Sequence, residues 1–389
     1  MFKLIIFFNS YTSGISGGDV RFIEITKRLS KKNIEILIIT SKLGKQICEK
    51  RGLRARYMIT TTEDRINNVA YVYFRRIINV LRLKLEIKDD IVLWSTSDFL
   101  PDVLSAFLFK RKNPKAIWIA SIYHLIPNPF KRPGHLKPSN ILSYIGQRVS
   151  LILIKRQADL IQTETLFLKN KLIKEYKIPS EKIINIQSGI DIITINSIIN
   201  KVSFIAGKIY DACFLARLHP SKGIFDLVKA WKLVCEHVND ARLAIAGHGS
   251  VGILSELNNL IKSLNLERNI DVLGFLSEEM KYKLFITCKL YVLPSYEEGI
   301  PITFYEAMYC GLPVITYYLP TYEEIKNYIV SVPLGNIEKL SEAIIKLIAD
   351  ENLAKDLAKK GREFAKEQTW DKITECIILW LEKLIKNIS

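Results

Sequence analysis

Short, continuous runs of apolar residues alternate with longer amphipathic segments in the first half of the chain. The first run covers residues 2–8, a segment with apolar positions near the helical period follows at 21–32, and a second run covers 34–40. Continuous apolar strands of this kind are typical of a parallel sheet that is covered on both faces. Further strands are predicted at 91–94, 116–120, 160–163 and 183–186.

The same pattern restarts in the second half. Strands are predicted at 209–216, 241–247, 270–274, 290–294 and 313–317, with helices at 223–238, 252–264 and 301–310. Two α/β units of similar size therefore meet near residues 195–205. We predict two Rossmann-like, doubly wound domains with a cleft between them at the carboxyl ends of their strands, where such sheets bind ligands.

Composition agrees with a globular chain of two or three domains. It has 389 residues, of which 49% are hydrophobic and 25% charged. The six cysteines form no C-x-x-C pair and have no His at metal spacing, so no disulfide framework or zinc site is predicted, and a reducing cytoplasm fits best. The apolar start is too short for a signal peptide, and no run reaches the 18 apolar residues of a membrane span. Any membrane contact should be peripheral.

The net charge of +16 is unevenly distributed. Residues 1–200 contain 33 Lys and Arg against 16 Asp and Glu, whereas residues 201–389 contain 23 against 24. A basic half suits a polyanionic partner, which could be an anionic membrane surface, an acidic acceptor or nucleic acid. A solvated surface is the alternative for any single cluster. The clusters include residues 31–32, 75–76, 109–115, 130–137 and 155–156.

A glycine-rich loop follows the first predicted strand. Gly14, Gly17 and Gly18 form G-x-x-G-G rather than the dinucleotide fingerprint, and the second strand ends without an acid for a ribose. An NAD site is therefore disfavoured. The small residues would let a phosphate, a sugar or another chain segment approach the helix N-terminus. A purely structural tight turn is the alternative.

Two cations lie in the corresponding loop of the second half. Arg217 and Lys222, in "LARLHPSKG", follow a predicted strand and precede a helix, where they could converge on one anion such as a diphosphate. Taken alone, two surface cations are more often solvated.

Two carboxylates flank the predicted helix at 301–310. Pro301 suits its first position, while Gly311 and Pro313 suit its end, so its N-terminus could bind a phosphate. Glu306 lies roughly 7 Å along the helix, about the distance from a diphosphate to its ribose, whose hydroxyls it could accept. Glu298 would lie toward the group that the diphosphate carries. Two unrelated surface acids are the alternative.

These motifs together resemble a known family. "EGIPITFYEAMYCGLPVI" resembles the E-x7-E signature of the retaining glycosyltransferases of family 4, which have the GT-B fold, and "ARLHPSKG" resembles their phosphate loop. Other matches follow in order along nearly the whole chain: "SGGDVRFIEITKRL", "INIQSGID", "AIAGHG", "VLGFLS" and "TWD". The resemblance implies an acceptor domain at 1–197, a donor domain at 203–365 and a C-terminal segment at 366–389 that packs back on the first domain.

The resemblance also implies roles for individual residues. Arg217 and Lys222 would neutralise the diphosphate of a nucleoside-diphosphate sugar, Glu306 would bind its ribose and Glu298 its sugar. No metal and no further cofactor is expected, because the leaving diphosphate would be stabilised electrostatically, with retention of configuration. The remaining implied positions are His124 and Glu298 as active-site residues, Gly17 and Gly18 near the phosphate or sugar, His248 beside the phosphates, Leu273 at the base, and the backbone of Gly299, Ile300, Pro301 and Ile302 at the sugar.

The sequence departs from the family pattern at three places. Ser188 stands where Asn is usual, and Asp19, Val20 and Arg21 replace a common Glu-Arg pair, which could alter acceptor contacts. Residues 321–335 lack the usual glycines, so the counterpart of that region's glutamate is either Glu323 or Glu324.

We predict a transferase that moves a sugar to a lipid-linked or membrane-borne glycan acceptor held by the basic N-terminal domain. It would be cytoplasmic and possibly peripheral on the membrane, with no nucleic-acid partner. The segment 141–157 suits an amphipathic surface helix or an ordinary interdomain one. Two alternatives remain: an epimerase of related architecture, active without an acceptor, and a basic membrane or polyanion-binding module that keeps a disused nucleotide cleft.

Overall fold

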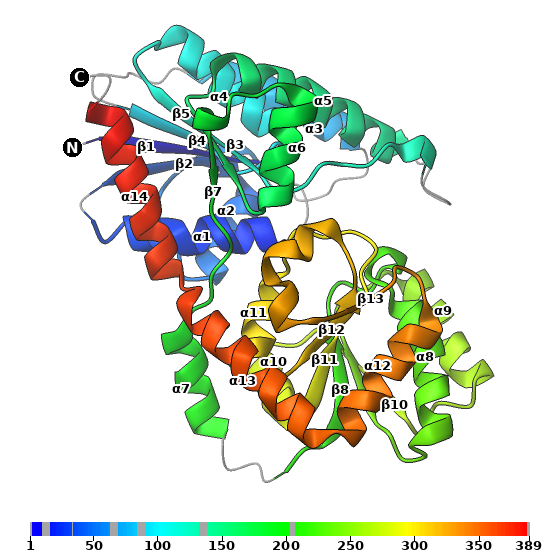
Figure 1. Cartoon of the computed structure of the whole chain (residues 1–389). Helices are drawn as coiled ribbons and strands as arrows, with labels where there is room; N and C mark the ends of the chain where they lie inside the picture. The colour runs from blue at the N-terminus through cyan, green and yellow to red at the C-terminus, as the bar shows by residue number, and fades with distance from the viewer. Residues whose placement is uncertain are drawn as a thin grey trace. The chain divides into compact units, whose positions relative to one another are not determined.

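The computed structural model describes residues 2–9, 16–32, 34–62, 69–83, 91–131, 138–202 and 207–386. The chain forms two compact units (Figure 1). Unit 1 comprises Met1–Ser188 with Trp370–Ser389, and unit 2 comprises Gly189–Thr369. No helix in these described ranges is both long and apolar enough to cross a bilayer.

Unit 1 is built on a seven-stranded parallel sheet with the order β3-β2-β1-β4-β5-β6-β7. The inner strands are apolar along their whole length, which the sequence pattern predicts for strands buried on both faces. The strands are β1 (Lys3–Phe8), β2 (Glu35–Ser41), β3 (Arg56–Thr61), β4 (Ile91–Ser95), β5 (Ile117–Ile122), β6 (Leu160–Thr163) and β7 (Ile183–Asn185).

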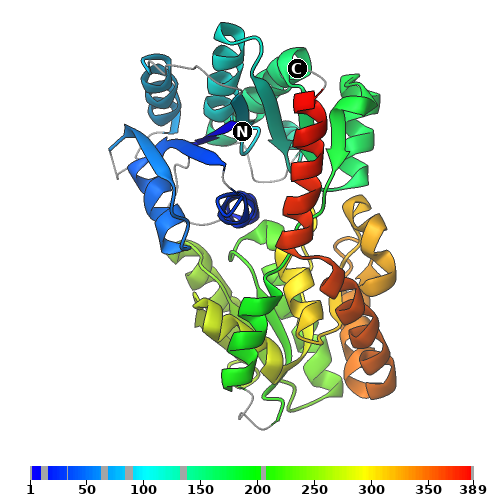
Figure 2. The same ribbon diagram turned by 90° about the vertical axis from the view of Figure 1, so that its left-hand side faces the viewer.

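Helices cover both faces of this sheet. One face carries α3 (Val69–Leu81), α4 (Leu100–Lys112) and α5 (Pro138–Gln157), which pack side by side. The other carries α1 (Gly17–Leu29) and α2 (Lys42–Lys50). The helix α14 (Trp370–Lys386) packs against α1 and crosses it, as Figures 1 and 2 together show. The helix α6 (Leu166–Tyr176) leads from β6 to β7.

The C-terminal helix joins unit 1 through charge as well as packing. Arg28 of α1 lies 3.1 Å from Asp371 at the start of α14, and Trp370, Ile373, Ile377 and Leu381 of α14 are buried. The apolar residues of α14 recur at helical spacing, so one stripe of the helix faces the unit.

Unit 2 repeats the topology with six parallel strands in the order β10-β9-β8-β11-β12-β13. The strands are β8 (Tyr210–Leu215), β9 (Leu243–Ala246), β10 (Ile270–Gly274), β11 (Cys288–Val292), β12 (Val314–Tyr317) and β13 (Val330–Val332). The helices are α7 (Ile192–Val202), α8 (Ile224–His237), α9 (Val251–Ser263), α10 (Glu278–Thr287), α11 (Ile302–Tyr309), α12 (Ile337–Ala349) and α13 (Glu351–Glu367). α12 packs on α8, whereas α13 packs on α11 and α7 on α10.

The predicted fold class is confirmed, since both units are doubly wound parallel sheets with Rossmann-like strand orders. The boundary expected at residue 197 falls inside α7. This helix belongs to unit 2, where Tyr309 donates a hydrogen bond to Asn196 Oδ1 at 2.9 Å.

Candidate functional site

The loops that follow β8 and β11 come together at the carboxyl edge of the unit 2 sheet. These strands are neighbours, and the strand order reverses between them. Gly223 has φ +69°, and a Cβ there would lie 1.9 Å from the carbonyl oxygen of Pro294, so only glycine permits this approach.

This close approach pairs two of the predicted site residues. The ammonium of Lys222 forms an ion pair with Glu298 Oε1, and Ser295 Oγ donates to the same oxygen at 3.2 Å. The two charged side chains are 16% and 18% exposed, so the pair is open enough to meet a ligand. Residues 76 positions apart are therefore brought into direct contact.

Arg217 and His248 lie on the loops that follow β8 and β9. Both side chains are exposed, and Leu218 N donates to the His248 carbonyl at 2.8 Å. Gly247 allows the second loop to pack tightly, because a Cβ there would lie 1.8 Å from the carbonyl oxygen of Ala216. The loop after β9 thus runs directly against the loop that carries Arg217.

The helix α11 begins one residue later than predicted. Pro301 is its N-cap with extended backbone (φ −62°, ψ 132°), and Ile302 is its first residue. Gly311 follows the helix with φ +81°, as its predicted place beyond the helix end requires. The N-terminus, preceded by Gly299 and Ile300, directs its first N–H groups toward the same sheet edge as Lys222.

Glu306 is held from one side by two residues that sequence reasoning missed. Its Oε1 accepts hydrogen bonds from Lys281 Nζ at 2.7 Å and from the Tyr282 hydroxyl at 2.9 Å. Glu306 itself is 8% exposed. Burial and the neighbouring carboxylate raise the pKa of Tyr282, which therefore stays a neutral donor.

The strand end expected at the nucleobase leads directly into the helix that carries those two donors. Leu273 is 38% exposed and Phe275 80%, and Gly274 between them has φ +69°. Ser277 then caps α10 by accepting from Met280 N at 3.3 Å. An exposed apolar turn and the two residues that donate to Glu306 therefore lie at the two ends of one short segment.

In unit 1 the structure brings Gly18 and the segment around His124 together. Gly17 and Gly18 open α1, which Ser16 and Asp19 cap by reciprocal side-chain hydrogen bonds. A Cβ on Gly18 would lie 2.9 Å from the ring of Tyr123. The side chain of His124, the next residue, is exposed.

Two neighbouring residues of α5 hold the backbone after β5. Gln147 Oε1 accepts from Ile126 N at 2.7 Å and its Nε2 donates to the His124 carbonyl at 2.9 Å, while Arg148 donates to the Ile126 carbonyl at 3.2 Å. Gln147 also donates to Asp98, whose burial raises its pKa to about 6. We call this arrangement, in which Gln147 and Arg148 bond to the backbone of His124 and Ile126, the clamp. Sequence reasoning gave no signal for it, because these residues meet only in the tertiary structure.

Two of the three departures from the family pattern meet inside unit 1. Arg21 is 1% exposed, and it donates to Ser188 Oγ at 3.2 Å and to the Ile186 carbonyl at 2.6 Å. Ser188 in turn donates to Glu164. The guanidinium of Arg21 is therefore enclosed by the protein itself, while the expectation that Asp19, Val20 and Arg21 together could alter acceptor contacts stays a prediction.

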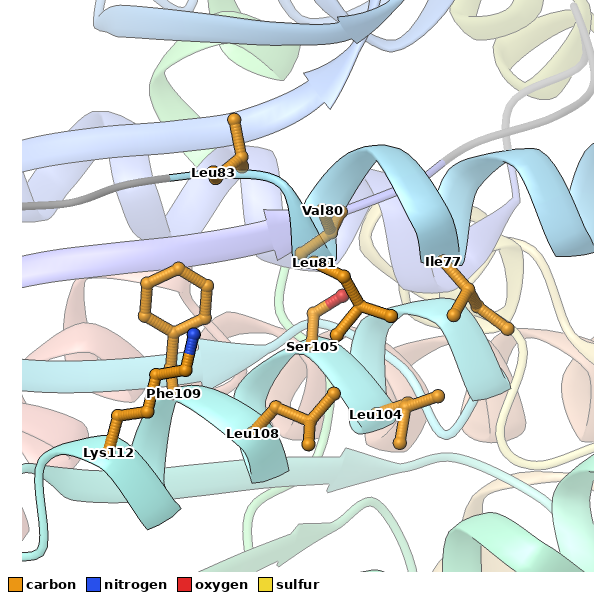
Figure 3. A pocket seen from close by; sticks show the side chains of 9 residues that line it. All are labelled: Ile77, Val80, Leu81, Leu83, Leu104, Ser105, Leu108, Phe109 and Lys112. Atoms are coloured by element: carbon orange, nitrogen blue, oxygen red, sulfur yellow. The ribbon is translucent and has the colours of Figure 1, made fainter.

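An apolar surface groove lies elsewhere, between α3 and α4 of unit 1 (Figure 3). Leu81 and Ile77 face Leu104 and Leu108 across it, with Lys112 at one end. None of the predicted site residues lines this groove. It is therefore separate from the residues that the sequence singled out.

Comparison with known proteins agrees with this arrangement. Residues 196–364 match the family described as Glycosyl transferases group 1. The chain is 22% identical over 360 residues to the alpha-galactosylglucosyldiacylglycerol synthase of Streptococcus pneumoniae, covering 86% of this chain and 90% of that protein.

Two solved structures share the fold. Anabaena HepE in complex with UDP-glucose has a TM-score of 0.73 at 17% identity, covering 98% of this chain and 99% of that one. Sucrose-phosphate synthase from Thermosynechococcus elongatus has a TM-score of 0.77 at 14% identity, with both chains fully covered. Residues 196–364 are therefore similar to the group 1 glycosyltransferases, and the whole chain has the two-unit GT-B fold that these solved structures share.

Proposed function

We propose that the protein is a retaining, metal-independent transferase that takes a sugar from a nucleoside-diphosphate donor bound by unit 2. The observation that carries the proposal is the ion pair of Lys222 with Glu298 at the carboxyl edge of the unit 2 sheet, with Arg217 on the same loop as Lys222 and Glu306 on the helix that follows Glu298. Arg217, Lys222, Glu298 and Glu306 lie on the loops after β8 and β11 and on α11. Oppositely charged groups in this order suit a ligand with an anionic diphosphate between two hydroxyl-rich sugars.

Each group would have its own part in the reaction. Arg217 and Lys222 would neutralise the diphosphate as it leaves, with the α11 N-terminus and His248 beside it. Glu298 and the backbone of Gly299–Ile302 would hold the donor sugar. The acceptor hydroxyl would attack from the face that the diphosphate leaves, and its proton would pass to a departing phosphate oxygen. His124, Gly17 and Gly18 remain predicted contacts from unit 1.

A lipid-linked acceptor at an anionic membrane surface is the acceptor that we propose for unit 1. This unit contains 36 Lys and Arg against 18 Asp and Glu, whereas unit 2 contains 20 against 22. On α5, Ile145, Val149 and Ile152 form an exposed apolar stripe that leads to Lys155 and Arg156. A relative named as a glycolipid synthase supports the same class of acceptor. We expect the protein at the cytoplasmic face of the membrane.

The donor is tested by thermal stabilisation with UDP, GDP, ADP, CMP and dTDP, with and without EDTA. A ligand that binds only the native state raises the melting temperature, and Glu306→Ala should abolish that rise. Stabilisation that requires metal would refute metal independence. If none of the five raises the melting temperature, the donor site itself is refuted.

The acceptor is tested with vesicles of phosphatidylglycerol and phosphatidylcholine. Sedimentation with the anionic vesicles alone, reversed by high salt, supports the membrane proposal. Turnover of the donor to an epimer without any acceptor would favour the epimerase alternative. An inverted anomeric configuration in the product, read by NMR, would refute retention.

A further inference from the structure

We infer that Lys281 and Tyr282 are positioning residues that fix the Glu306 carboxylate so that the enzyme selects a ribonucleotide over a deoxyribonucleotide. The inference rests on the proposed function, because it assigns the ribose of the donor to Glu306. It adds which residues hold that carboxylate, and which ribose hydroxyls donate to its second oxygen.

The two oxygens of Glu306 have different surroundings. Lys281 Nζ at 2.7 Å and the Tyr282 hydroxyl at 2.9 Å both donate to Oε1. A carboxylate oxygen has two lone pairs in the carboxylate plane, so these two donors occupy Oε1. No donor among the described residues reaches Oε2 of this side chain, whose residue is only 8% exposed. The oxygen that remains for a ligand is Oε2.

The two donors are themselves held in place. Lys281 is 14% exposed, lies 4.0 Å from Glu278 on the same helix, and has its ammonium 4.3 Å from the centre of the Tyr282 ring. Tyr282 is 4% exposed, and its raised pKa keeps its proton available for donation. Rotation of the carboxylate would break both hydrogen bonds, so the orientation of Oε2 is fixed before a ligand arrives.

A fixed acceptor favours hydroxyl groups that match its position. Oε2 can accept from the 2′-hydroxyl and 3′-hydroxyl of a ribose at once, and a 2′-deoxy sugar loses one of these charge-assisted bonds. Such a bond corresponds to about tenfold or more in affinity. Without Lys281 and Tyr282, the carboxylate can turn, and the preference for the 2′-hydroxyl should shrink.

The test compares dissociation constants for UDP and 2′-deoxy-UDP, or for GDP and 2′-deoxy-GDP if the thermal panel selects guanine. We expect the wild type to bind the ribonucleotide about tenfold or more tightly. Lys281→Met and Tyr282→Phe should each weaken ribonucleotide binding and lower this ratio to about twofold to threefold, while deoxyribonucleotide binding changes little. Lys281→Arg should restore most of the ratio, because a guanidinium can donate to the same oxygen.

The control is Lys283→Met, which removes the same charge from the same helix at a residue with no side-chain bond to Glu306. It should keep the wild-type ratio. An equal loss of both nucleotides in Lys281→Met and Tyr282→Phe, or a wild type without preference, would overturn the inference while the donor site stands. If no nucleoside diphosphate binds the wild type, the donor site and this inference both fail.

Discussion

The two units share a strand order but use the point where it reverses in opposite ways. In unit 2, the loops after β8 and β11 carry the exposed Arg217 and the partly open pair of Lys222 and Glu298. In unit 1, the corresponding strands are β1 and β4, and Asn9, Thr96 and Asp102, which follow them, are buried. The same topology thus carries a partly open charged pair in one unit and a buried polar cluster in the other.

The buried polar cluster of unit 1 makes its hydrogen bonds largely within its own chain. Asp102 is 2% exposed, and its Oδ1 accepts from the backbone N and the side-chain amide of Asn9, both at 2.8 Å. Ser97 donates to its other oxygen at 3.0 Å, and the buried Arg76 donates to the Asn9 carbonyl. Burial raises the pKa of Asp102 to about 7, a large change that internal hydrogen bonds only partly offset. Both oxygens of the Asp102 carboxylate are thus occupied within the unit rather than turned toward a ligand.

The largest effect is expected from the glycine that brings the unit 2 loops together. Gly223→Ala places a methyl group against Pro294 in a left-handed backbone, so we expect a loss of about 3 kcal/mol or more in the free energy of unfolding. Gly311→Ala is the matched control, because its φ is +81° but nothing lies within 4 Å of the added carbon. It should cost about 1 kcal/mol. Equal shifts in the urea midpoints would contradict the role assigned to the close approach.

The next prediction concerns Lys222, and it tests whether the charged loops of unit 2 bind the donor. Lys222→Ala should lower kcat/KM for the donor by about 100-fold, since one cation beside the diphosphate is lost. The control is Lys229→Ala, which removes an exposed lysine from α8 and should change the rate little. If steady-state kinetics show the same loss in both variants, the pair with Glu298 has no special part in donor binding.

A smaller effect is expected from the clamp in unit 1. Gln147→Leu removes the hydrogen bonds to the backbone of His124 and Ile126, and we expect kcat to fall about tenfold with nucleotide affinity unchanged. Gln157→Leu makes the same change at the end of the same helix, where the side-chain Oε1 has no partner among the described residues. A weaker nucleotide affinity in Gln147→Leu alone would show that the clamp acts on more than the segment around His124.

The last effect concerns the pH dependence of the buried polar cluster in unit 1. Because the folded pKa of Asp102 is raised to about 7 from 3.8, the folded state binds more protons than the unfolded state between these values. The wild type should therefore lose stability as pH rises through this window, by at most about 1.4 kcal/mol per pH unit. Asp102→Asn removes this dependence. Urea titrations should therefore show that the free energy of unfolding of the variant rises relative to that of the wild type toward pH 7. A constant difference across the window would show that Asp102 stays ionised in the fold.

Much of this fold could be predicted because its buried strands are continuous apolar runs. Residues 160–163 and 270–274 were predicted with the bounds that the structure gives. The strand β3 was missed, because it lies at the sheet edge and its "RYMITT" is half-exposed and mixed in polarity. Edge strands lack the apolar pattern that a twice-covered strand requires.

The candidate site could be predicted only where its signal is local. Glu298 and Glu306 are separated by a helix start, so their spacing can be read from the sequence. Lys281 and Tyr282 gave no signal, since they reach Glu306 only through the packing of unit 2. The ion pair of Lys222 with Glu298 likewise depends on the neighbouring positions of β8 and β11 in the sheet.

The return of α14 to α1 has a consequence for the newly made chain. A ribosome completes α1 long before it reaches Trp370, so the stripe that α14 buries on unit 1 stays uncovered while unit 2 is being made. Domains generally fold as units as they emerge during synthesis. Unit 2 is continuous in sequence and can finish first, and the N-terminal unit acquires its last surface only at the end of translation. A premature stop codon before Trp370 would therefore leave the first domain to be made, rather than the last, incomplete.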